Sequence, residues 1–424
     1  MKKLYFVFLG LLLISVCDAG MSNTKKKSKK ENKIFFRKPL VTQSSKASYD
    51  AVKAMNLFSL KILKLCTDNE PDKYAENLII SPQLTFMNLS KFYIGSAGKT
   101  RYELGKVMGF DSDNEQLLKG INYAQYLLYK SAQKSNVYLK FADSLWVDKN
   151  VKIAKDFQNI IKNYLCTEYY KEDFSDKNKL CKKINKWTSL RTYKMIKNII
   201  SPESLLDDLR LVSINTAFFK GLWTNKFNHA MTVKRNFYVN KDTTIKVPMM
   251  RQKEEFFYRE NESYQFVSLP FRGEEFAMNL ILPKENCSMK EIIKSLTIKD
   301  LNEPLSYKDL CNVSLSLPRF EISHFVDNKP MLEKLGVSDA FNVNKADFSQ
   351  MSPNRGLCIA KIYQKAFIRV NEYGAKATAA DLIGADDFGG AEKKVTFNAN
   401  RPFLFFIVHK DTNLILFTGY VLQP

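Results

Sequence analysis

The sequence has few of the residues on which enzyme active sites depend. It contains only three histidines, His229, His324 and His409. No serine stands in a Gly-x-Ser-x-Gly turn, no Gly-x-Gly-x-x-Gly follows a predicted strand, and no spacing of Cys and His suits zinc. His324 and His409 lie on strand patterns, where histidines are commonly structural. An enzyme of a standard class is therefore poorly supported, and we expect no metal and no cofactor.

A glycine-containing segment at residues 95–100, GSAGKT, resembles the end of a phosphate-binding loop. That loop requires a further glycine where Tyr93 stands, and it follows a strand rather than a helix. The pattern that precedes it here is helical, so we interpret the glycines as a helix stop.

Cysteines are sparse as well. The chain has seven, and none forms a close pair in the sequence. This spacing excludes a disulfide-rich scaffold. Six cysteines would remain after removal of an N-terminal signal peptide. One or two disulfide bridges among them are possible, but the sequence alone does not show which cysteines pair. The six are Cys66, Cys166, Cys181, Cys287, Cys311 and Cys358.

Long apolar runs are missing except at the N-terminus. There Lys2 and Lys3 precede an apolar run, Leu4 to Val16, which Cys17-Asp18-Ala19 ends. This order predicts a secretory signal peptide over residues 1–19, in preference to a buried helix or a lipidated cysteine. The run is too short to span a bilayer comfortably. We expect a secreted, extracellular protein without a membrane span.

Acidic residues are outnumbered. Lys and Arg number 65 and Asp and Glu 44, which gives a formal net charge of +21. Loss of the signal leaves about +20, because it carries two lysines and one aspartate. The excess predicts attraction to polyanions, which for a secreted protein are glycosaminoglycans or acidic cell surfaces rather than nucleic acid. Part of this positive charge lies at residues 22–33, within a basic extension over residues 20–46 that is predicted to be disordered. The extension either binds a polyanion or only keeps the protein soluble.

Helical periodicity dominates the first half of the remaining chain, and strand patterns dominate the second. Residues 47–66 have helical spacing, and Ser81-Pro82 starts a second helix. Helical patterns run from 103 to 200, interrupted by one predicted strand at 137–149. No linker or repeat divides residues 47–424, so we expect one α+β domain, and a monomer.

Four Asn-x-Ser sequons occur in the chain. Asn261 and Asn286 lie in polar surroundings and are the predicted glycosylation sites. Asn88 falls within a helix pattern and Asn312 opens a strand, so we expect no glycans at these two.

The second half of the chain carries motifs that resemble a known family. The segment Phe397–Ile407, FNANRPFLFFI, resembles the serpin signature, and LVSINTAFFKGLWTNKF resembles the central strand and breach of serpins. The resemblance extends over residues 47–424, and several of its motifs are specific. The matching residues include Asn215, Lys220, Gly221, Trp223, Asn400, Arg401, Pro402 and Phe403.

The resemblance implies a domain of about nine helices around three β-sheets, with an exposed reactive-centre loop near residues 372–396. In serpins this loop is bait. The serine of a protease attacks it and forms an acyl-enzyme, and the cleaved loop then inserts into the main sheet as a new strand. The strain that is released distorts the protease. The chain itself is then an inhibitor and not an enzyme.

The resemblance also assigns residues to the shutter and the breach, the regions where the main sheet opens. Three positions depart from the family pattern: Leu84 replaces a second serine, Gln364 a common histidine, and Lys194 a usual glycine. We expect these departures to change how easily the sheet opens while leaving the fold intact. The assigned shutter and breach residues are Ser81, Pro82, Asn215, Trp223 and Gln364.

The start of the predicted loop has the composition that an inserting strand needs. Because side chains alternate between the two faces of a strand, the odd positions from 375 to 381 would turn inward. Three of them are alanines, which enter with little steric cost, but the fourth, Asp381, would bury a carboxylate at high energy unless it is paired or protonated. The predicted hinge comprises Glu372, Gly374, Ala375, Lys376, Ala377, Thr378, Ala379, Ala380 and Asp381.

Spacing also predicts the bond that a protease cleaves. Roughly seventeen residues counted from Glu372, as insertion requires of a typical loop, reach Phe388. The predicted reactive bond is therefore Phe388–Gly389, and an aromatic residue suits a chymotrypsin-like pocket. If the loop is longer or shorter than typical, the cleaved bond lies at another residue. Leu382 or Ile383 would then suit an elastase-like enzyme, and Lys393 or Lys394 a trypsin-like one.

Two functions follow from these observations. The first is a secreted suicide inhibitor of chymotrypsin-like serine proteases. The alternative is a non-inhibitory serpin that acts as a binding or carrier module, its loop cleaved as an ordinary substrate; Asp381 and the basic charge motivate it. Candidate lysines for polyanion binding are those of the tail, Lys25–Lys30, and three on a predicted helix, Lys119, Lys130 and Lys134.

Overall fold

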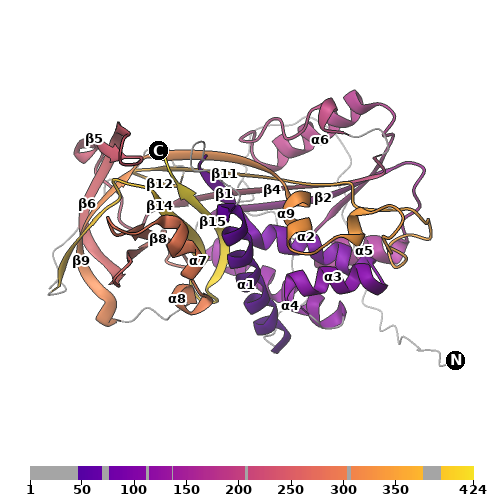
Figure 1. Ribbon diagram of the computed structural model, residues 1–424, viewed down its shortest axis with the longest axis horizontal. Helices are drawn as coiled ribbons and strands as arrows, with labels where there is room; N and C mark the ends of the chain where they lie inside the picture. The colour runs from indigo at the N-terminus through magenta and orange to yellow at the C-terminus, as the bar shows by residue number, and fades with distance from the viewer. Residues whose placement is uncertain are drawn as a thin grey trace, which may run out of the picture. The chain divides into compact units, whose positions relative to one another are not determined.

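The computed structural model describes residues 46–68, 76–110, 114–135, 137–205, 209–302, 307–375 and 393–424. All of them lie in one compact unit, Lys33–Pro424. The described part of the chain contains nine α-helices and fifteen strands, and most of the helices precede most of the strands, so the α+β prediction is confirmed (Figure 1). The helices are α1 (Lys46–Asp68), α2 (Pro82–Gly95), α3 (Gly98–Met108), α4 (Asn114–Ser135), α5 (Lys155–Tyr164), α6 (Lys177–Arg191), α7 (Met289–Ser295), α8 (Ile298–Asn302) and α9 (Asn328–Lys334).

The strands form two hydrogen-bonded sheets. The six-stranded sheet has the order β10 (Phe320–Asp327), β11 (Lys361–Asn371), β12 (Gly374–Ala375), β4 (Leu211–Leu222), β2 (Tyr138–Asp148) and β3 (Glu168–Glu172). The nine-stranded sheet has the order β1 (Leu78–Ile80), β15 (Leu414–Val421), β14 (Phe403–His409), β8 (Phe276–Pro283), β7 (Tyr264–Pro270), β6 (Thr244–Glu260), β9 (Leu310–Pro318) and β13 (Lys394–Asn398), with β5 (Val233–Tyr238) paired to β6.

Three sheets were expected from the resemblance, and the described residues form two. The reason is strand β6, which is 17 residues long. One end of β6 pairs with β5 and the other with β7, while β9 follows it through most of its length. Two expected sheets therefore share one continuous strand and one hydrogen-bond ladder.

Local signals in the sequence explain where the second helix begins and ends. Ser81 caps α2, its hydroxyl accepting a hydrogen bond from the Leu84 backbone N–H at 3.4 Å, and Pro82 occupies the first helical position. The helix ends at Gly95, which confirms the interpretation of the glycines as a stop. The next helix begins at Gly98, whose φ of +52° favours glycine.

The predicted helix at 47–66 and strand at 137–149 are confirmed as α1 and β2. Helices dominate the rest of 103–200 as predicted, but the sequence did not predict the short strand β3 at Glu168–Glu172. This strand is five residues long, pairs only with β2, and has no fully buried side chain. An edge strand so short gives no periodic signal in the sequence, and its pairing with β2 decides its conformation.

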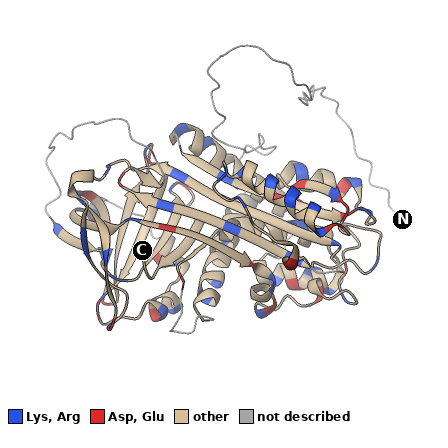
Figure 2. Cartoon of the chain, turned by 90° about the horizontal axis from the view of Figure 1, so that it is seen from above, with Lys and Arg blue, Asp and Glu red and all other residues tan. Residues whose placement is uncertain are grey.

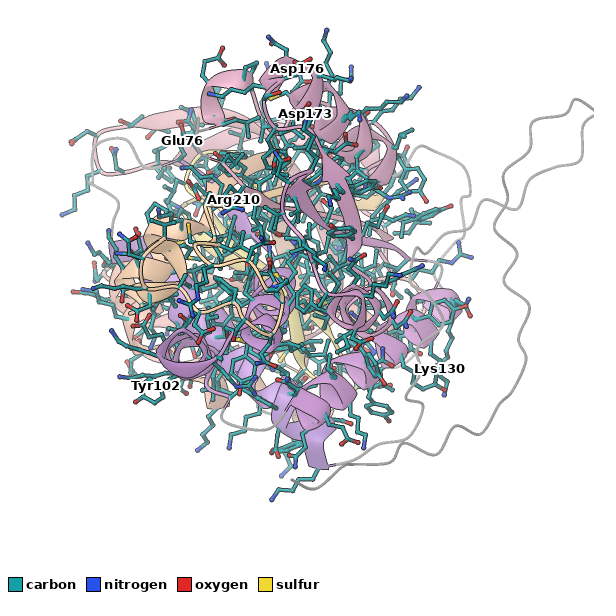
Figure 3. All side chains as sticks on the ribbon, turned by 90° about the vertical axis from the view of Figure 1, so that its right-hand side faces the viewer. Glu76, Tyr102, Lys130, Asp173, Asp176 and Arg210 are labelled. Carbon is teal, nitrogen blue, oxygen red and sulfur yellow. The ribbon has the colours of Figure 1, made fainter. Side chains whose placement is uncertain are left out.

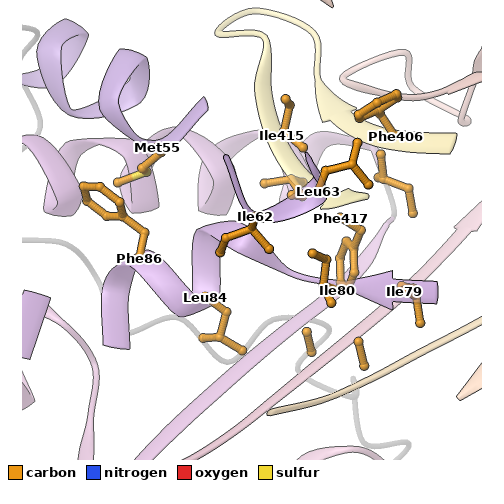
Figure 4. Close-up of a cluster of buried hydrophobic side chains, with 14 of the residues drawn as sticks. Met55, Ile62, Leu63, Ile79, Ile80, Leu84, Phe86, Phe406, Ile415 and Phe417 are labelled. Carbon is orange, nitrogen blue, oxygen red and sulfur yellow. The ribbon is translucent and has the colours of Figure 1, made fainter. Parts of the chain in front are cut away.

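The hydrophobic core lies between the two sheets and under the first helices. Figure 4 shows side chains of α1 and α2 packed against β14 and β15, among them Met55, Phe86, Phe406 and Phe417. Phe417 also stacks on Phe141 of β2 with ring centroids 5.7 Å apart, which joins the sheets directly. Burial of each such ring contributes roughly 1.5–3 kcal/mol to folding.

The opposite face of the six-stranded sheet carries α6 (Figure 1). Leu180, Ile184 and Trp187 of this helix are buried against Trp146 and Val212 of the sheet. The segment that follows α6 continues across the same face. The six-stranded sheet is thus covered on one face by the main core and crossed on the other by α6.

Candidate functional site: the seam between β4 and β11

Strands β4 and β11 lie side by side and parallel along part of their length. Residues 361–367 of β11 pair with residues 212–218 of β4, and we call this junction the seam. Beyond it the two strands separate, and β12 lies between them. Gly374 and Ala375 each pair with both strands, antiparallel to both. The first part of the predicted hinge therefore already belongs to the sheet.

The entry of β12 depends on two glycines that face each other. Gly374 has a φ of +138°, and a Cβ there would lie 2.0 Å from the carbonyl oxygen of Gly221. A Cβ on Gly221 would in turn lie 2.8 Å from the ring of Phe271. Only glycine permits this backbone approach.

Glu372 anchors the turn that leads into β12. Its carboxylate accepts hydrogen bonds from Thr232 Oγ1 at 2.6 Å and from Arg319 Nε at 2.7 Å. Burial alone would raise the pKa of Glu372, but the hydrogen bonds from Arg319 and Thr232 outweigh it and hold the pKa below its ordinary value. The predicted hinge glutamate is thus ionised and fixed at neutral pH.

Trp223 closes the end of the seam that β12 enters. Its Nε1 donates to the Asn371 carbonyl at 3.0 Å, and its backbone N–H donates to the Tyr373 carbonyl at 3.0 Å. The indole stacks on Phe271 with centroids 4.6 Å apart and is only 2% exposed. This indole therefore ties β4 to the turn before the hinge. We use the name breach for the cluster of Trp223, Glu372, Arg319 and Thr232.

Under the middle of the seam, Gln364 of β11 binds the start of α2. Its Oε1 accepts from the Ser81 backbone N–H at 2.9 Å, and its Nε2 donates to the Ser81 carbonyl at 3.1 Å and to Thr85 Oγ1 at 2.9 Å. The Ser81 hydroxyl donates to the Leu416 carbonyl at 2.8 Å. Gln364 therefore satisfies both backbone groups of Ser81, at the position where the resemblance led us to expect histidine.

Asn215 of β4 faces Gln364 across the seam and opens a second, ionic part of the cluster. It accepts a hydrogen bond from the Asn88 amide and donates one to Asp143 Oδ1. Asp143 also binds Lys91 Nζ at 2.6 Å. The lysine side chain is fully buried and that of Asp143 is 4% exposed. We use the name shutter for these residues together with Ser81, Thr85 and Gln364.

Burial dominates the electrostatics of the shutter. It lowers the pKa of Lys91, and the ion pair with Asp143 opposes that shift. The hydroxyl of Thr167 is a further donor to Asp143. A carboxylate and an ammonium this deeply buried persist only because each satisfies the other.

The sequence did not assign six of these eleven residues, Thr85 among them. Asn88 was considered only as a sequon, and Lys91 and Asp143 were not singled out, nor were Thr232 and Arg319. One signal was present: Lys91 is the only charged residue in α2, all of whose residues are buried. A lysine in so apolar a helix predicts a buried acidic partner, although nothing in the sequence identifies which.

Two departures from the family pattern have structural counterparts. Leu84 is completely buried, so the position offers packing where serine would offer a hydrogen bond. Lys194 has a φ of +62°, a conformation that glycine adopts without strain and lysine does not.

The rest of the predicted loop lies outside the described residues. This applies to Lys376, Ala377, Thr378, Ala379, Ala380, Asp381, Leu382, Ile383, Phe388 and Gly389. Lys393 and Lys394 are described, and they belong to a sheet edge: Lys394 pairs with Asn312 in β9, and the Lys393 carbonyl accepts from the Asn312 N–H at 2.9 Å. This pairing argues against either lysine as the bait residue, because a protease requires an unpaired strand.

The predicted glycosylation sites differ in surroundings from the other sequons. Asn261 and Asn286 are exposed, whereas Asn88 is fully buried in the shutter. The six described cysteines are all free thiols, so none of the bridges left open by the sequence is present among them. No helix in the described ranges combines the length and apolarity that crossing a bilayer requires.

One cluster outside the seam has the residue types of a metal site. Ligand atoms of Glu275, His409 and Asp411 lie within 4.8 Å of one another. Glu275 is already engaged, because it accepts from Ser131 Oγ at 2.7 Å and pairs with the ammonium of Lys134. His409 contacts the same serine and is 1% exposed. The Lys134 ammonium already neutralises Glu275, the one buried carboxylate of this cluster, which suits a structural ion pair better than a metal.

Comparison with known proteins identifies the class of this fold. A family model described as serpin (serine protease inhibitor) matches residues 53–424. Serpin B10 of Bos taurus is 29% identical over 399 residues, covering 88% of this chain and 99% of that protein. Antichymotrypsin-2 of Bombyx mori is 29% identical over 366 residues, covering 85% and 95%.

Solved structures agree with these sequence matches. Maspin superposes with a TM-score of 0.80 at 26% identity, covering 90% of this chain and 100% of that one. Native protease nexin-1, solved with heparin, superposes with a TM-score of 0.76 at 29% identity, covering 88% and 100%. The chain belongs to the serpin family, and the predicted serpin fold is confirmed. Family membership supports protease inhibition as its general activity.

Proposed function

We propose that this protein is a secreted suicide-substrate inhibitor of chymotrypsin-like serine proteases, acting by cleavage at Phe388–Gly389 and insertion of the loop into the six-stranded sheet. The observation that carries the proposal is the position of β12. Gly374 and Ala375 occupy the place of an inserting strand between β4 and β11, with the pairing that further insertion would extend. Each further residue would add hydrogen bonds to two strands at once.

Extension of that pairing bears on Asp381. Ala375 pairs with Gly221 and with Val370. Antiparallel pairing carried on for six residues would bring Asp381 opposite Asn215 and Gln364, which are already partners across the seam. Both carry amide donors, and Asn215 is hydrogen-bonded to Asp143, the partner of buried Lys91. A carboxylate that arrives there meets a polar network rather than an apolar core, which favours insertion.

The specificity rests on the loop and on one relative. Phe388 is the aromatic residue that the count from Glu372 reaches, and an aromatic residue fits an apolar chymotrypsin-like pocket. The similarity to a protein named antichymotrypsin-2 supports the same class of protease. Secretion rests on the predicted signal peptide at residues 1–19. Attraction to a polyanion is supported by the charge of +21 and by the similarity to a serpin solved with heparin.

Incubation with chymotrypsin tests the proposal. We expect a covalent complex that survives denaturing electrophoresis, and mass spectrometry of the released C-terminal peptide should locate the new N-terminus at Gly389. A Phe388→Ala variant should lose complex formation with chymotrypsin, and a Lys394→Ala variant should retain it. Loop cleavage that leaves chymotrypsin fully active and forms no complex contradicts the proposal.

The second candidate function is a non-inhibitory binding or carrier module. Asp381 favours it, because a second carboxylate beside Asp143 would add negative charge to a buried site that holds one lysine. An Asp381→Thr variant distinguishes the two functions. If the original chain is only cleaved and the variant forms complexes, Asp381 blocks insertion and the binding module is supported. If both form complexes, inhibition stands.

A further inference from the structure

Helix α6, which crosses the outer face of the six-stranded sheet, carries charge of one sign. It contains five lysines and one arginine and no acidic residue. Its apolar side packs on the sheet through residues such as Ile184 and Trp187, so its lysines point outward. Two more exposed lysines follow in the segment after the helix. We use the name α6 basic face for five exposed lysines: Lys179, Lys182, Lys186, Lys194 and Lys197.

These five lysines are not neutralised within the described part of the chain. None of them forms an ion pair there. The other cations of α6 differ, since Lys183 pairs with Glu172 and Arg191 with Glu168. The α6 basic face therefore keeps its full charge for a partner.

The lysines that the sequence analysis named on a helix contrast with this face. They lie on α4, where Lys119 pairs with Glu115 and Lys134 with Glu275. Lys130 is the one of the three for which the structure gives no ion pair in its described part. The structure thus favours α6 over α4 as the place where a polyanion would bind.

The two acidic residues nearest the start of α6 already have partners, one outside the helix and one at its N-terminus. Asp173 pairs with Lys149, with the Nζ–Oδ2 distance 2.6 Å. Asp176 caps the helix and accepts from the Lys179 N–H at 2.9 Å. Figure 3 shows both aspartates together at one side of the molecule, with Lys130 far from them at another. The carboxylates of this region therefore do not mask the α6 basic face.

The spacing of the lysines gives the face a direction. Lys179, Lys182 and Lys186 stand at helical positions i, i+3 and i+7, a row about 10 Å long at 1.5 Å per residue. Lys194 and Lys197 add two exposed cations in the segment that follows the helix. Figure 2, which views the molecule from this side, shows many Lys and Arg positions in blue along the helices and strands. A row of cations matches a linear polyanion.

One lysine of the sheet, Lys140, lies beside the end of α6. Burial, together with the nearby charge of Arg191, lowers the pKa of Lys140 to about 8. Lys140 lies on β2, and its Nζ is 4.9 Å from the ring centroid of Tyr193, which follows α6. Positive charge on both sides of this segment adds to its attraction for an anion.

We propose that the α6 basic face binds a linear sulfated polysaccharide of the glycosaminoglycan class. The inference rests on the proposed attraction of this protein to polyanions and assigns it to a surface. The folded domain, rather than the basic tail or α4, then holds the polysaccharide. The segment after α6 also crosses the seam, since Ile196 packs against Phe218 of β4 and Phe367 of β11.

Heparin serves as the probe, and binding is measured at several salt concentrations with the full chain. The test variant carries Lys179→Gln, Lys182→Gln and Lys186→Gln. A matched control carries Lys106→Gln, Lys119→Gln and Lys130→Gln, which removes the same charge from exposed positions on α3 and α4. Because each lysine near a polyanion contributes about 1 kcal/mol, we expect the α6 variant to bind about 100-fold more weakly and with a smaller salt dependence. The control should stay within about threefold.

Three results overturn the proposal. The first is equal weakening of both variants, which indicates attraction by net charge alone. The second is loss of binding on deletion of Lys25–Lys30 with the α6 variant unchanged, which assigns binding to the tail. The third is binding to vesicles of anionic phospholipid without binding to heparin. Thermal unfolding of each variant verifies its fold. Chymotrypsin complexes are measured separately, so failure of inhibition and failure of this binding site are distinguishable.

Discussion

The breach and the shutter each contain an ion pair, but the two pairs differ in their exposure to solvent. At the breach, Glu372 binds Arg319, whose side chain is 34% exposed. At the shutter, Lys91 binds Asp143 with almost no solvent access to either. A pair that touches water contributes little, because solvent competes for both charges. A buried pair contributes little as a pair, but the loss of one partner is severe, because the other charge stays buried.

The difference suggests a division of labour along the seam. The breach already contains β12, so extension of the sheet begins there without a new opening. The shutter holds β4, β11, β2 and α2 in one hydrogen-bonded network through Gln364, Asn215 and Asp143. We therefore expect changes at the shutter to alter overall stability and changes at the breach to act locally. The predictions below test this contrast, from the largest effect to the smallest.

The largest effect should follow from breaking the buried ion pair. Lys91→Met leaves Asp143 charged and without its cation, and we expect a loss of about 3–5 kcal/mol. A serpin that inhibits by loop insertion is kinetically trapped in its native state, so the unfolding rate in denaturant is measured as well as the midpoint. Adding Asp143→Asn should restore most of the loss. Equal destabilisation of the single and double variants would contradict the account of the shutter.

The next effect concerns the entry of β12. Gly374→Ala places a methyl group 2.0 Å from the Gly221 carbonyl oxygen, and we expect it to displace β12 at a cost of about 1–3 kcal/mol. Hydrogen exchange of peptides containing Gly221 and Ala375 should quicken, while peptides from the shutter stay protected. Gly336→Ala is the control, because its φ of +102° is also positive but no atom lies within 4 Å of its Cβ. Exchange that changes equally at the breach and at the shutter would refute a local role for β12.

A smaller effect should appear with pH. Glu372 has a folded-state pKa below its ordinary value of 4.5. The stability it provides is therefore complete above that ordinary value and is lost as the pH falls through the lower, folded pKa. Glu372→Gln should cost about 0.5–1 kcal/mol at pH 7, because Arg319 is partly exposed. The difference between the two proteins should shrink as the pH falls from 4.5 towards the folded pKa. A difference that persists unchanged under acid would show that the Glu372 carboxylate is not the titrating group.

The smallest effect is a gain in stability at a residue outside both the breach and the shutter. Lys194 is strained by its φ of +62°, and Lys194→Gly should stabilise the protein by about 0.5 kcal/mol, because the chain entropy that glycine adds offsets part of the relieved strain. Lys197→Gly is the control, since Lys197 is not among the residues with positive φ. It should destabilise by a similar amount through added chain entropy. The unfolding midpoints of the two variants should move in opposite directions, and movement in the same direction would exclude strain at Lys194.

Sequence and structure agree where the signal is local. Ser81, Pro82 and Gly95 mark the ends of α2 by capping and stop rules, and the strand predicted at 137–149 is found as β2. The ion-pair partners of the charged residues could not be predicted from a local signal. Lys91 and Asp143 lie 52 residues apart, and Arg319 and Glu372 lie 53 apart. The fold brings them together, and no local periodicity records such a pairing.

The same limit explains the treatment of Asn88. Its sequon and its helical setting were both visible in the sequence, and the prediction of no glycan at this position agrees with its complete burial but remains a prediction. The hydrogen bond to Asn215 was not visible, because it depends on how α2 lies beneath the sheet. The resemblance to serpin motifs identified Asn215 and Gln364 as shutter residues, which the local sequence pattern did not.

The most direct test of the account is thermal unfolding before and after cleavage of the loop at Phe388–Gly389. If the hinge continues the strand that Gly374 and Ala375 begin, the cleaved protein gains a full central strand and unfolds at a much higher temperature than the intact protein. An Asp381→Thr variant measured beside it shows whether the carboxylate reduces that gain. The central claim is contradicted if cleavage leaves the unfolding temperature unchanged both in the original protein and in the Asp381→Thr variant.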